Sequence, residues 1–123
     1  YKTMKIQTFR DLITWQKAHE AVLSIYNITE QFPDKEKFGL TSQMRRAAIS
    51  MTSNIAEGFS RQSLKEKIQF YHITLGSNTE LQNQILVAKD LKYIDSDISD
   101  EVLFKLIEVN KLANGLIKSL RMS

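Results

Sequence analysis

Apolar side chains recur at intervals of three and four residues in four separate stretches of this 123-residue chain. The stretches cover residues 10–31, 41–57, 64–91 and 97–120, and such spacing places the apolar side chains on one face of an α-helix. No long stretch alternates apolar and polar residues at the period of two that is typical of a β-strand. The pattern therefore predicts an all-α protein.

Short connections separate the four predicted helices, and short connections favour neighbouring helices that run antiparallel. We therefore expect an antiparallel, up-down-up-down four-helix bundle over residues 9–121, preceded by a flexible N-terminal tail at residues 1–8. A chain of this length can bury the core of one domain.

Residues that favour helix ends mark the expected boundaries of the first two helices. Phe32-Pro33 ends the first helix, because the residue before proline is pushed out of the helical region. Thr41 or Ser42 is expected to cap the start of the second helix. Gly58 is expected to end it in the left-handed conformation.

The last two helices have similar signals. Ser63 and Glu66 have the spacing of a capping box before the third helix. Asp97 or Ser99 can cap the fourth helix. Gly76 lies inside the third helix, where glycine costs about 1 kcal/mol relative to alanine, and we expect a packing contact there.

The chain contains no cysteine, which excludes a disulfide scaffold, a thiolate zinc site and a cysteine nucleophile. No apolar run is long enough to span a bilayer, and the first eight residues are too polar for a signal peptide. We therefore expect a cytoplasmic protein with no membrane partner.

An enzyme is not indicated. A di-metal site in a four-helix bundle needs two Glu-x-x-His pairs, but Gln16 and Gln69 precede the two histidines, His19 and His72. No phosphate loop, dinucleotide fingerprint or zinc spacing occurs either. We expect no bound metal, no cofactor and no small-molecule substrate.

Two carboxylates, Glu57 and Glu80, lie among small polar residues and could perform acid–base chemistry as a pair. The alternative is structural, because a partly buried Glu80 needs a cation such as Arg45 or Arg46. In the structural interpretation, Asn54 satisfies backbone groups at the end of the second helix.

The net charge is only +3, but the excess of basic residues is concentrated in one segment of the chain. Residues 41–72 hold five basic and two acidic side chains, whereas residues 92–123 hold five of each. The five basic residues of the first segment are the candidate phosphate-binding residues, with Phe59 as a stacking partner: Arg45, Arg46, Arg61, Lys65 and Lys67. The alternative is one structural ion pair and a solvated face.

Several apolar residues fall outside the stripes of the predicted helices, namely Ile49, Phe59, Phe70 and Phe104. They either widen the buried faces of the bundle or form an interface between copies of the chain, since exposed apolar patches usually bind a partner.

The most distinctive motifs lie in the second predicted helix. Residues 38–50 read FGLTSQMRRAAIS and residues 53–58 read SNIAEG. Together with FRDL at residues 9–12 and WQKA at residues 15–18, they resemble the family of four-helix bundles named for the 23S ribosomal RNA intervening-sequence protein. Gly76-Ser77 and Glu80-Leu81 also fit, so the resemblance covers residues 8–120.

The resemblance implies a cytoplasmic bacterial protein that assembles into a ring-like homopentamer. It also implies a relation to the accessory protein of diversity-generating retroelements, which works with RNA through a basic surface. We therefore predict a non-catalytic, RNA-associated, homo-oligomeric bundle. The alternative is a protein-interaction scaffold that binds no nucleic acid.

Overall fold

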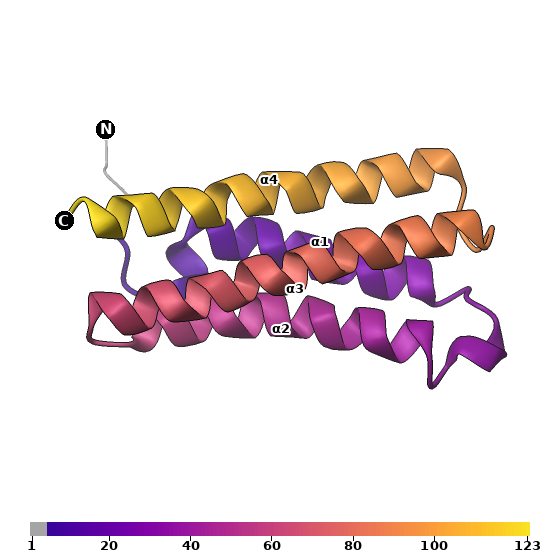
Figure 1. Cartoon of the computed structure of the whole chain (residues 1–123), viewed down its shortest axis with the longest axis horizontal. Helices are drawn as coiled ribbons and strands as arrows, with labels where there is room; N and C mark the ends of the chain where they lie inside the picture. Colours follow the sequence, from indigo (N-terminus) through magenta and orange to yellow (C-terminus); the bar gives the residue numbers. More distant parts are fainter. Residues whose placement is uncertain (1–4) are drawn as a thin grey trace.

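The computed structural model describes residues 5–123, and it forms a bundle of four long helices (Figure 1). In chain order the elements are the 3₁₀ helix η1 (Phe9–Asp11), α1 (Ile13–Thr29), the 3₁₀ helix η2 (Asp34–Glu36), α2 (Leu40–Ser60), α3 (Leu64–Asp90) and α4 (Ser96–Arg121). Each connection reverses the direction of the chain. The predicted all-α, up-down-up-down bundle is confirmed, and residues 5–123 contain no β-strand.

Residues 1–4 of the expected tail lie outside the described residues. Of the remainder, Thr8 forms a capping box with Asp11, whose side chain accepts hydrogen bonds from the backbone N–H groups of Gln7 and Thr8. These bonds hold the pKa of Asp11 below its ordinary value.

The four helices surround one hydrophobic core. α1 and α3 each pack against both α2 and α4. The largest fully buried apolar side chains come from all four helices: Ile25, Met44, Met51, Ile55, Leu81, Ile85, Leu106 and Val109. Buried alanines at positions such as Ala21, Ala47 and Ala88 leave the neighbouring helix room to approach.

A buried amide group connects α3 to α4 inside the core. Asn78 is fully buried and donates from Nδ2 to the Leu106 carbonyl over 2.8 Å. Its Oδ1 accepts from Gln82 Nε2 at 2.7 Å. A buried amide with both ends bonded is satisfied in only one alignment of the two helices, so Asn78 helps to fix their register.

The prediction that Gly58 ends the second helix is wrong. α2 continues to Ser60, and none of the glycines in residues 5–123 has a positive φ. Gly58 is buried in α2, where Tyr71 of α3 packs directly against it. Its small size is required for this contact between helices. Burial also raises the pKa of Tyr71.

Two predicted caps are also wrong. Glu36, in the preceding 3₁₀ helix, caps the start of α2 by accepting from the Leu40 backbone N–H at 3.1 Å. Asp95 caps α4 by accepting from the Ile98 backbone N–H at 2.9 Å. At α3 the predicted cap is confirmed, because Ser63 Oγ accepts from the Glu66 backbone N–H.

Gly76 does not have the packing contact that we expected from the sequence. It is exposed on α3, and a Cβ atom built there meets nothing within 4 Å in this chain.

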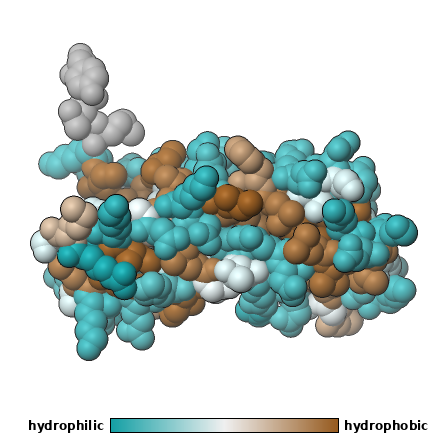
Figure 2. Space-filling view, turned by 45° about the horizontal axis from the view of Figure 1, so that its top comes forward, coloured by the Kyte–Doolittle hydropathy of each residue, from teal (hydrophilic) through white to brown (hydrophobic). Residues whose placement is uncertain are grey.

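The outer surface mixes polar and apolar side chains. In Figure 2, apolar patches are interrupted by hydrophilic side chains across the face that is shown. No helix within residues 5–123 is both long and apolar enough to cross a membrane.

Candidate nucleic-acid interface

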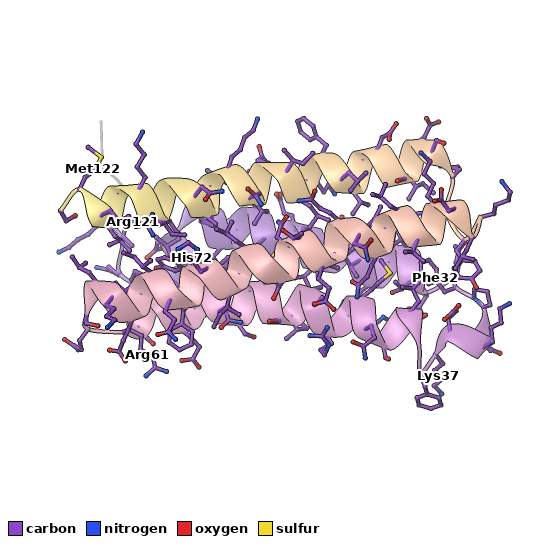
Figure 3. All side chains as sticks on the ribbon, in the orientation of Figure 1. Phe32, Lys37, Arg61, His72, Arg121 and Met122 are labelled. Atoms are coloured by element: carbon purple, nitrogen blue, oxygen red, sulfur yellow. The ribbon has the colours of Figure 1, made fainter. Side chains whose placement is uncertain are left out.

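Folding separates the charges along the long axis of the bundle. At one end lie residues 5–12, the α2–α3 turn at residues 57–67, and the last turn of α4 at residues 118–121 (Figure 1). We call this the basic end; it holds seven basic and three acidic side chains, a net charge of +4. Figure 3 shows Arg61 and Arg121 there.

The opposite end has the opposite charge. It consists of the connection at residues 30–39 and the α3–α4 turn at residues 89–101. This acidic end holds eight acidic and four basic side chains, a net charge of −4. The molecule therefore carries a strong charge asymmetry, although its total charge is small.

Arg45 does not lie at the basic end and has a structural environment. Its Nε donates to the buried Thr29 hydroxyl at 2.9 Å, and its guanidinium lies 4.7 Å from the centre of the Tyr26 ring. It also pairs with Glu30 at 3.3 Å. These contacts join α2 to α1 and use most of the donors of Arg45.

Arg46 forms the ion pair that the sequence suggested for Glu80. Its guanidinium donates to the Glu80 carboxylate of α3 and to Gln43 of its own helix. Gln84 donates to the same carboxylate at 3.2 Å. Glu80 is thus a structural acceptor between α2 and α3. It lies in the second half of α3, whereas Glu57 lies in the last turn of α2, at the basic end.

Arg61 belongs to the basic end and pairs with Glu57 at 3.0 Å, one turn earlier in α2. Its guanidinium also lies 4.8 Å from the centre of the Phe70 ring. Because both members of this ion pair remain exposed, Arg61 still presents charge to solvent.

Lys67 and Lys65 are near neighbours with different environments. Lys67 Nζ donates to the carbonyls of Phe59 and Gly58, at 2.7 and 3.4 Å, and so closes the C-terminal end of α2. Lys65 is exposed, with no carboxylate partner among residues 5–123. Lys65 is therefore the candidate that is most available to a ligand.

Asn54 does not satisfy backbone groups at a helix end. It lies inside α2 and donates from Nδ2 to the Ser50 carbonyl at 2.8 Å. The structure therefore gives Asn54 a local role one turn within its own helix. Ser50, in turn, shares a 2.8 Å hydrogen bond with Ser77 of α3.

A shallow hollow between α3 and α4 at the basic end was not predicted from the sequence. It has a volume of about 580 Å³ and is lined by Lys65, Ile68, Gln69, His72, Ile73 and Arg121. Arg121 Nη2 lies 3.4 Å from His72 Nε2 (Figure 3). The lining of the hollow combines aliphatic and cationic side chains, so it fits an anionic partner that also has an apolar part.

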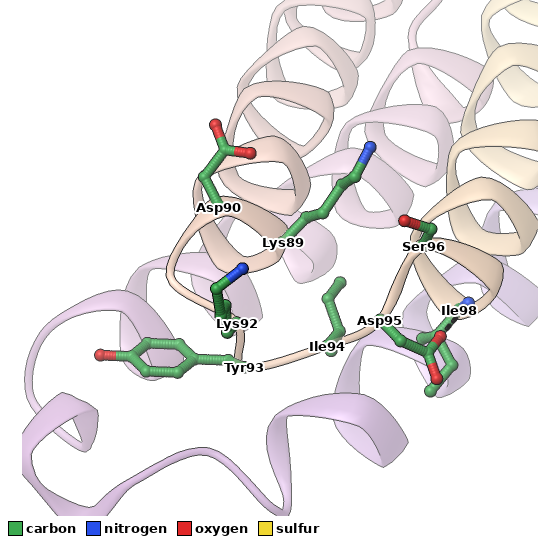
Figure 4. A pocket seen from close by; sticks show the side chains of 8 residues that line it. All are labelled: Lys89, Asp90, Lys92, Tyr93, Ile94, Asp95, Ser96 and Ile98. Carbon is green, nitrogen blue, oxygen red and sulfur yellow. Dashed lines mark hydrogen bonds between the residues drawn. The ribbon is translucent and has the colours of Figure 1, made fainter.

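A second hollow, of about 680 Å³, lies at the α3–α4 turn (Figure 4). Its polar side chains, including Asp90, Lys92 and Asp95, point in different directions and do not converge on a common point. Across residues 5–123, no three His, Asp or Glu side chains are grouped as metal ligands would be. The geometry does not assemble a catalytic or metal site at this turn.

Two aromatic side chains are strongly exposed, one at the acidic end and one along the side of the bundle. Phe104 of α4 is 70% exposed and Phe38, just before α2, is 88% exposed. Ile49 of α2 is also exposed, whereas Phe59 and Phe70 are half-buried. Large apolar side chains at this exposure are typical of surfaces that bind a partner.

Comparison with known proteins places the fold. A crystal structure of a protein with unknown function from the S23 ribosomal protein family of Bacteroides thetaiotaomicron is similar, with a TM-score of 0.80 and 24% sequence identity. The match covers 86% of this chain and 96% of that chain. A search of curated proteins gives no significant match.

The model of one protein family, described as the 23S rRNA-intervening sequence protein, matches residues 10–115. This range contains nearly all of the bundle, from η1 to the last turns of α4. The chain therefore belongs to the 23S rRNA-intervening sequence protein family.

Proposed function

We propose that this protein is a non-catalytic, RNA-associated accessory protein whose basic end contacts RNA phosphates. The observation that carries the proposal is the gathering of three separate basic segments at one end of the bundle, with a net charge of +4. Contacts to phosphates supply most of the affinity of non-specific RNA binding and need little sequence readout.

Five cations of the basic end have no carboxylate partner within residues 5–123, so their charges are not neutralised in the fold: Lys5, Arg10, Lys65, Lys118 and Arg121. The last three lie on the long helices α3 and α4 and are the phosphate ligands that we propose. Arg61 adds a partly neutralised charge. Arg45, Arg46 and Lys67 contribute mainly to the stability of the bundle.

The family supports an association with RNA, because its model is described by an intervening sequence of 23S rRNA. The exposed apolar side chains support self-association through the sides of the helices. A homopentamer, which the sequence resemblance implies, would present five basic ends and multiply the attraction for a polyanion.

Binding of a labelled single-stranded RNA to the purified protein tests the proposal. The variant Lys65→Gln/Lys118→Gln/Arg121→Gln should bind at least about tenfold more weakly than the wild type, because three phosphate contacts are lost. The matched control, Lys35→Gln/Lys89→Gln/Lys92→Gln, removes three lysines from the acidic end. Equal affinities of the two variants would contradict the proposal.

The second candidate function is a protein-interaction scaffold. The exposure of Phe38 and Phe104 favours it, since neither side chain is needed to complete the core of the chain. A protein partner that survives nuclease treatment, and that is lost with Phe38→Ser or Phe104→Ser, would support the scaffold. A partner lost on nuclease treatment would support RNA association.

A further inference from the structure

The two ends of the bundle are complementary in apolar surface as well as in charge. At the acidic end, Leu91 is 51% exposed and Ile98 is 38% exposed. They lie in the α3–α4 turn together with the exposed carboxylates of Asp90, Asp97 and Asp100. This turn therefore combines exposed apolar side chains with a net charge of −3, because five acidic side chains outnumber Lys89 and Lys92 over residues 89–101.

The hollow at the basic end has the matching properties. Its apolar lining consists of Ile68 and Ile73, and its cationic lining of Lys65 and Arg121, with His72 beside them. It is open to solvent between α3 and α4 at the basic end, so side chains of another molecule can reach it. Each chain thus carries one acidic, apolar turn and one basic, apolar hollow.

We propose that the α3–α4 turn of one copy docks in the hollow at the basic end of a second copy, in a staggered head-to-tail contact. Leu91 lies against Ile68 and Ile73, and the acidic side chains of the turn face Lys65 and Arg121. This contact does not require RNA, but it uses Lys65 and Arg121, two of the cations that the proposed function assigns to RNA phosphates.

The small area and the opposite charges of the two surfaces predict a weak contact that depends on salt. One end of a small bundle offers less surface than a stable dimer interface of about 1,200–2,000 Å², so the contact is weak and depends on charge. Each docked pair leaves one free turn and one free hollow, so the association continues beyond a dimer or closes into a ring. An interface through the apolar sides of the helices would not weaken when salt is added.

Sedimentation velocity of nuclease-treated protein, free of nucleic acid, measures the contact. We expect the average mass to fall between about 0.01 M and about 1 M salt, as the Debye length shrinks from about 30 Å to about 3 Å. Two charge-reversed variants make the test specific. Asp90→Lys/Asp100→Lys brings the net charge of the acidic end from −4 to zero, and Lys65→Glu/Arg121→Glu brings that of the basic end from +4 to zero.

Each charge-reversed variant alone should show the lower mass of the wild type at high salt, with an unchanged helical circular dichroism spectrum. An equimolar mixture of the two variants should recover association at low salt, because the unchanged hollow of one variant can bind the unchanged turn of the other. An average mass that is independent of salt, or a mixture that does not associate, would overturn the head-to-tail contact. The RNA affinity of Asp90→Lys/Asp100→Lys should not fall, which separates this contact from the proposed function.

Discussion

Tyr71 of α3 lies so close to Gly58 of α2 that no side chain fits between them. A methyl group on Gly58 would lie 2.7 Å from Cε1 of Tyr71 and 3.1 Å from Cβ of Phe70. Overpacking costs about 1–3 kcal/mol, and the better helix propensity of alanine offsets about 1 kcal/mol of this. We expect Gly58→Ala to lower the free energy of unfolding by about 1 kcal/mol, measured by urea denaturation.

Gly76 is the matched control for this substitution, since it lies in the neighbouring helix with open space around it. Gly76→Ala should raise the free energy of unfolding by up to about 1 kcal/mol, because only the helix propensity changes. If Gly58→Ala were also stabilising, the close approach of Tyr71 would be incorrect.

Asn78 is fully buried, so water cannot replace the hydrogen bonds that its side chain makes. Asn78→Ala removes the donor to the Leu106 carbonyl and the acceptor for Gln82, and it leaves a small cavity. We expect a loss of about 2 kcal/mol or more in thermal or urea unfolding. Asn114→Ala, at an exposed position bonded only within α4, should change stability by less than about 0.5 kcal/mol. Similar losses at both positions would contradict the role given to Asn78.

We expect Arg45 to stabilise the bundle and not to contact RNA. Arg45→Gln loses the bond to Thr29 and the stacking on Tyr26, so the free energy of unfolding should fall by about 1–2 kcal/mol. At a temperature where the variant is folded, its RNA affinity should match that of the wild type. A tenfold loss of RNA affinity with normal stability would instead place Arg45 in the RNA interface.

Stability at acid pH should depend on Glu36. The backbone N–H of Leu40 and then the Tyr93 hydroxyl hold the pKa of Glu36 below its ordinary value of 4.5. A carboxylate with a lowered pKa stabilises the fold above that ordinary value, and this contribution is lost as the pH falls through the lowered pKa. Glu36→Gln should therefore lower the urea midpoint at neutral pH.

The difference between Glu36→Gln and the wild type should shrink as the pH falls below the ordinary value of 4.5 and through the lowered pKa of Glu36, where the wild-type carboxylate becomes protonated. Tyr93→Phe is the second probe, because the Tyr93 hydroxyl donates to Glu36 at 2.8 Å. A difference that stays constant with pH would mean that the charge of Glu36 is not what stabilises this end of the bundle.

The existence and order of the four helices could be predicted from the sequence because each apolar stripe lasts several turns. Only some of their ends could be predicted: the cap of α3 at Ser63 was, whereas the caps of α2 and α4 and the end of α2 were not. Gly58 has the residue type of a helix end, but Tyr71 uses its small size for packing. The cap of α2 comes from Glu36, which lies in the preceding connection.

The candidate site was predictable only in part. The pair of Glu80 with Arg46 follows from the need of a half-buried carboxylate for a cation, and the structure contains it. The charge separation does not follow from sequence, because residues 92–123 are neutral as a segment. Folding places residues 95–101 at the acidic end and residues 118–121 at the basic end, which only the topology determines.

The salt dependence of RNA binding tests the central claim most directly. The slope of log affinity against log salt counts the phosphates that are neutralised, at about 0.7 unit per contact for a single strand. Lys65→Gln/Lys118→Gln/Arg121→Gln should have a slope about two units per bound chain shallower than the wild type, with the acidic-end control unchanged. Identical slopes for all three proteins would contradict RNA binding through the basic end.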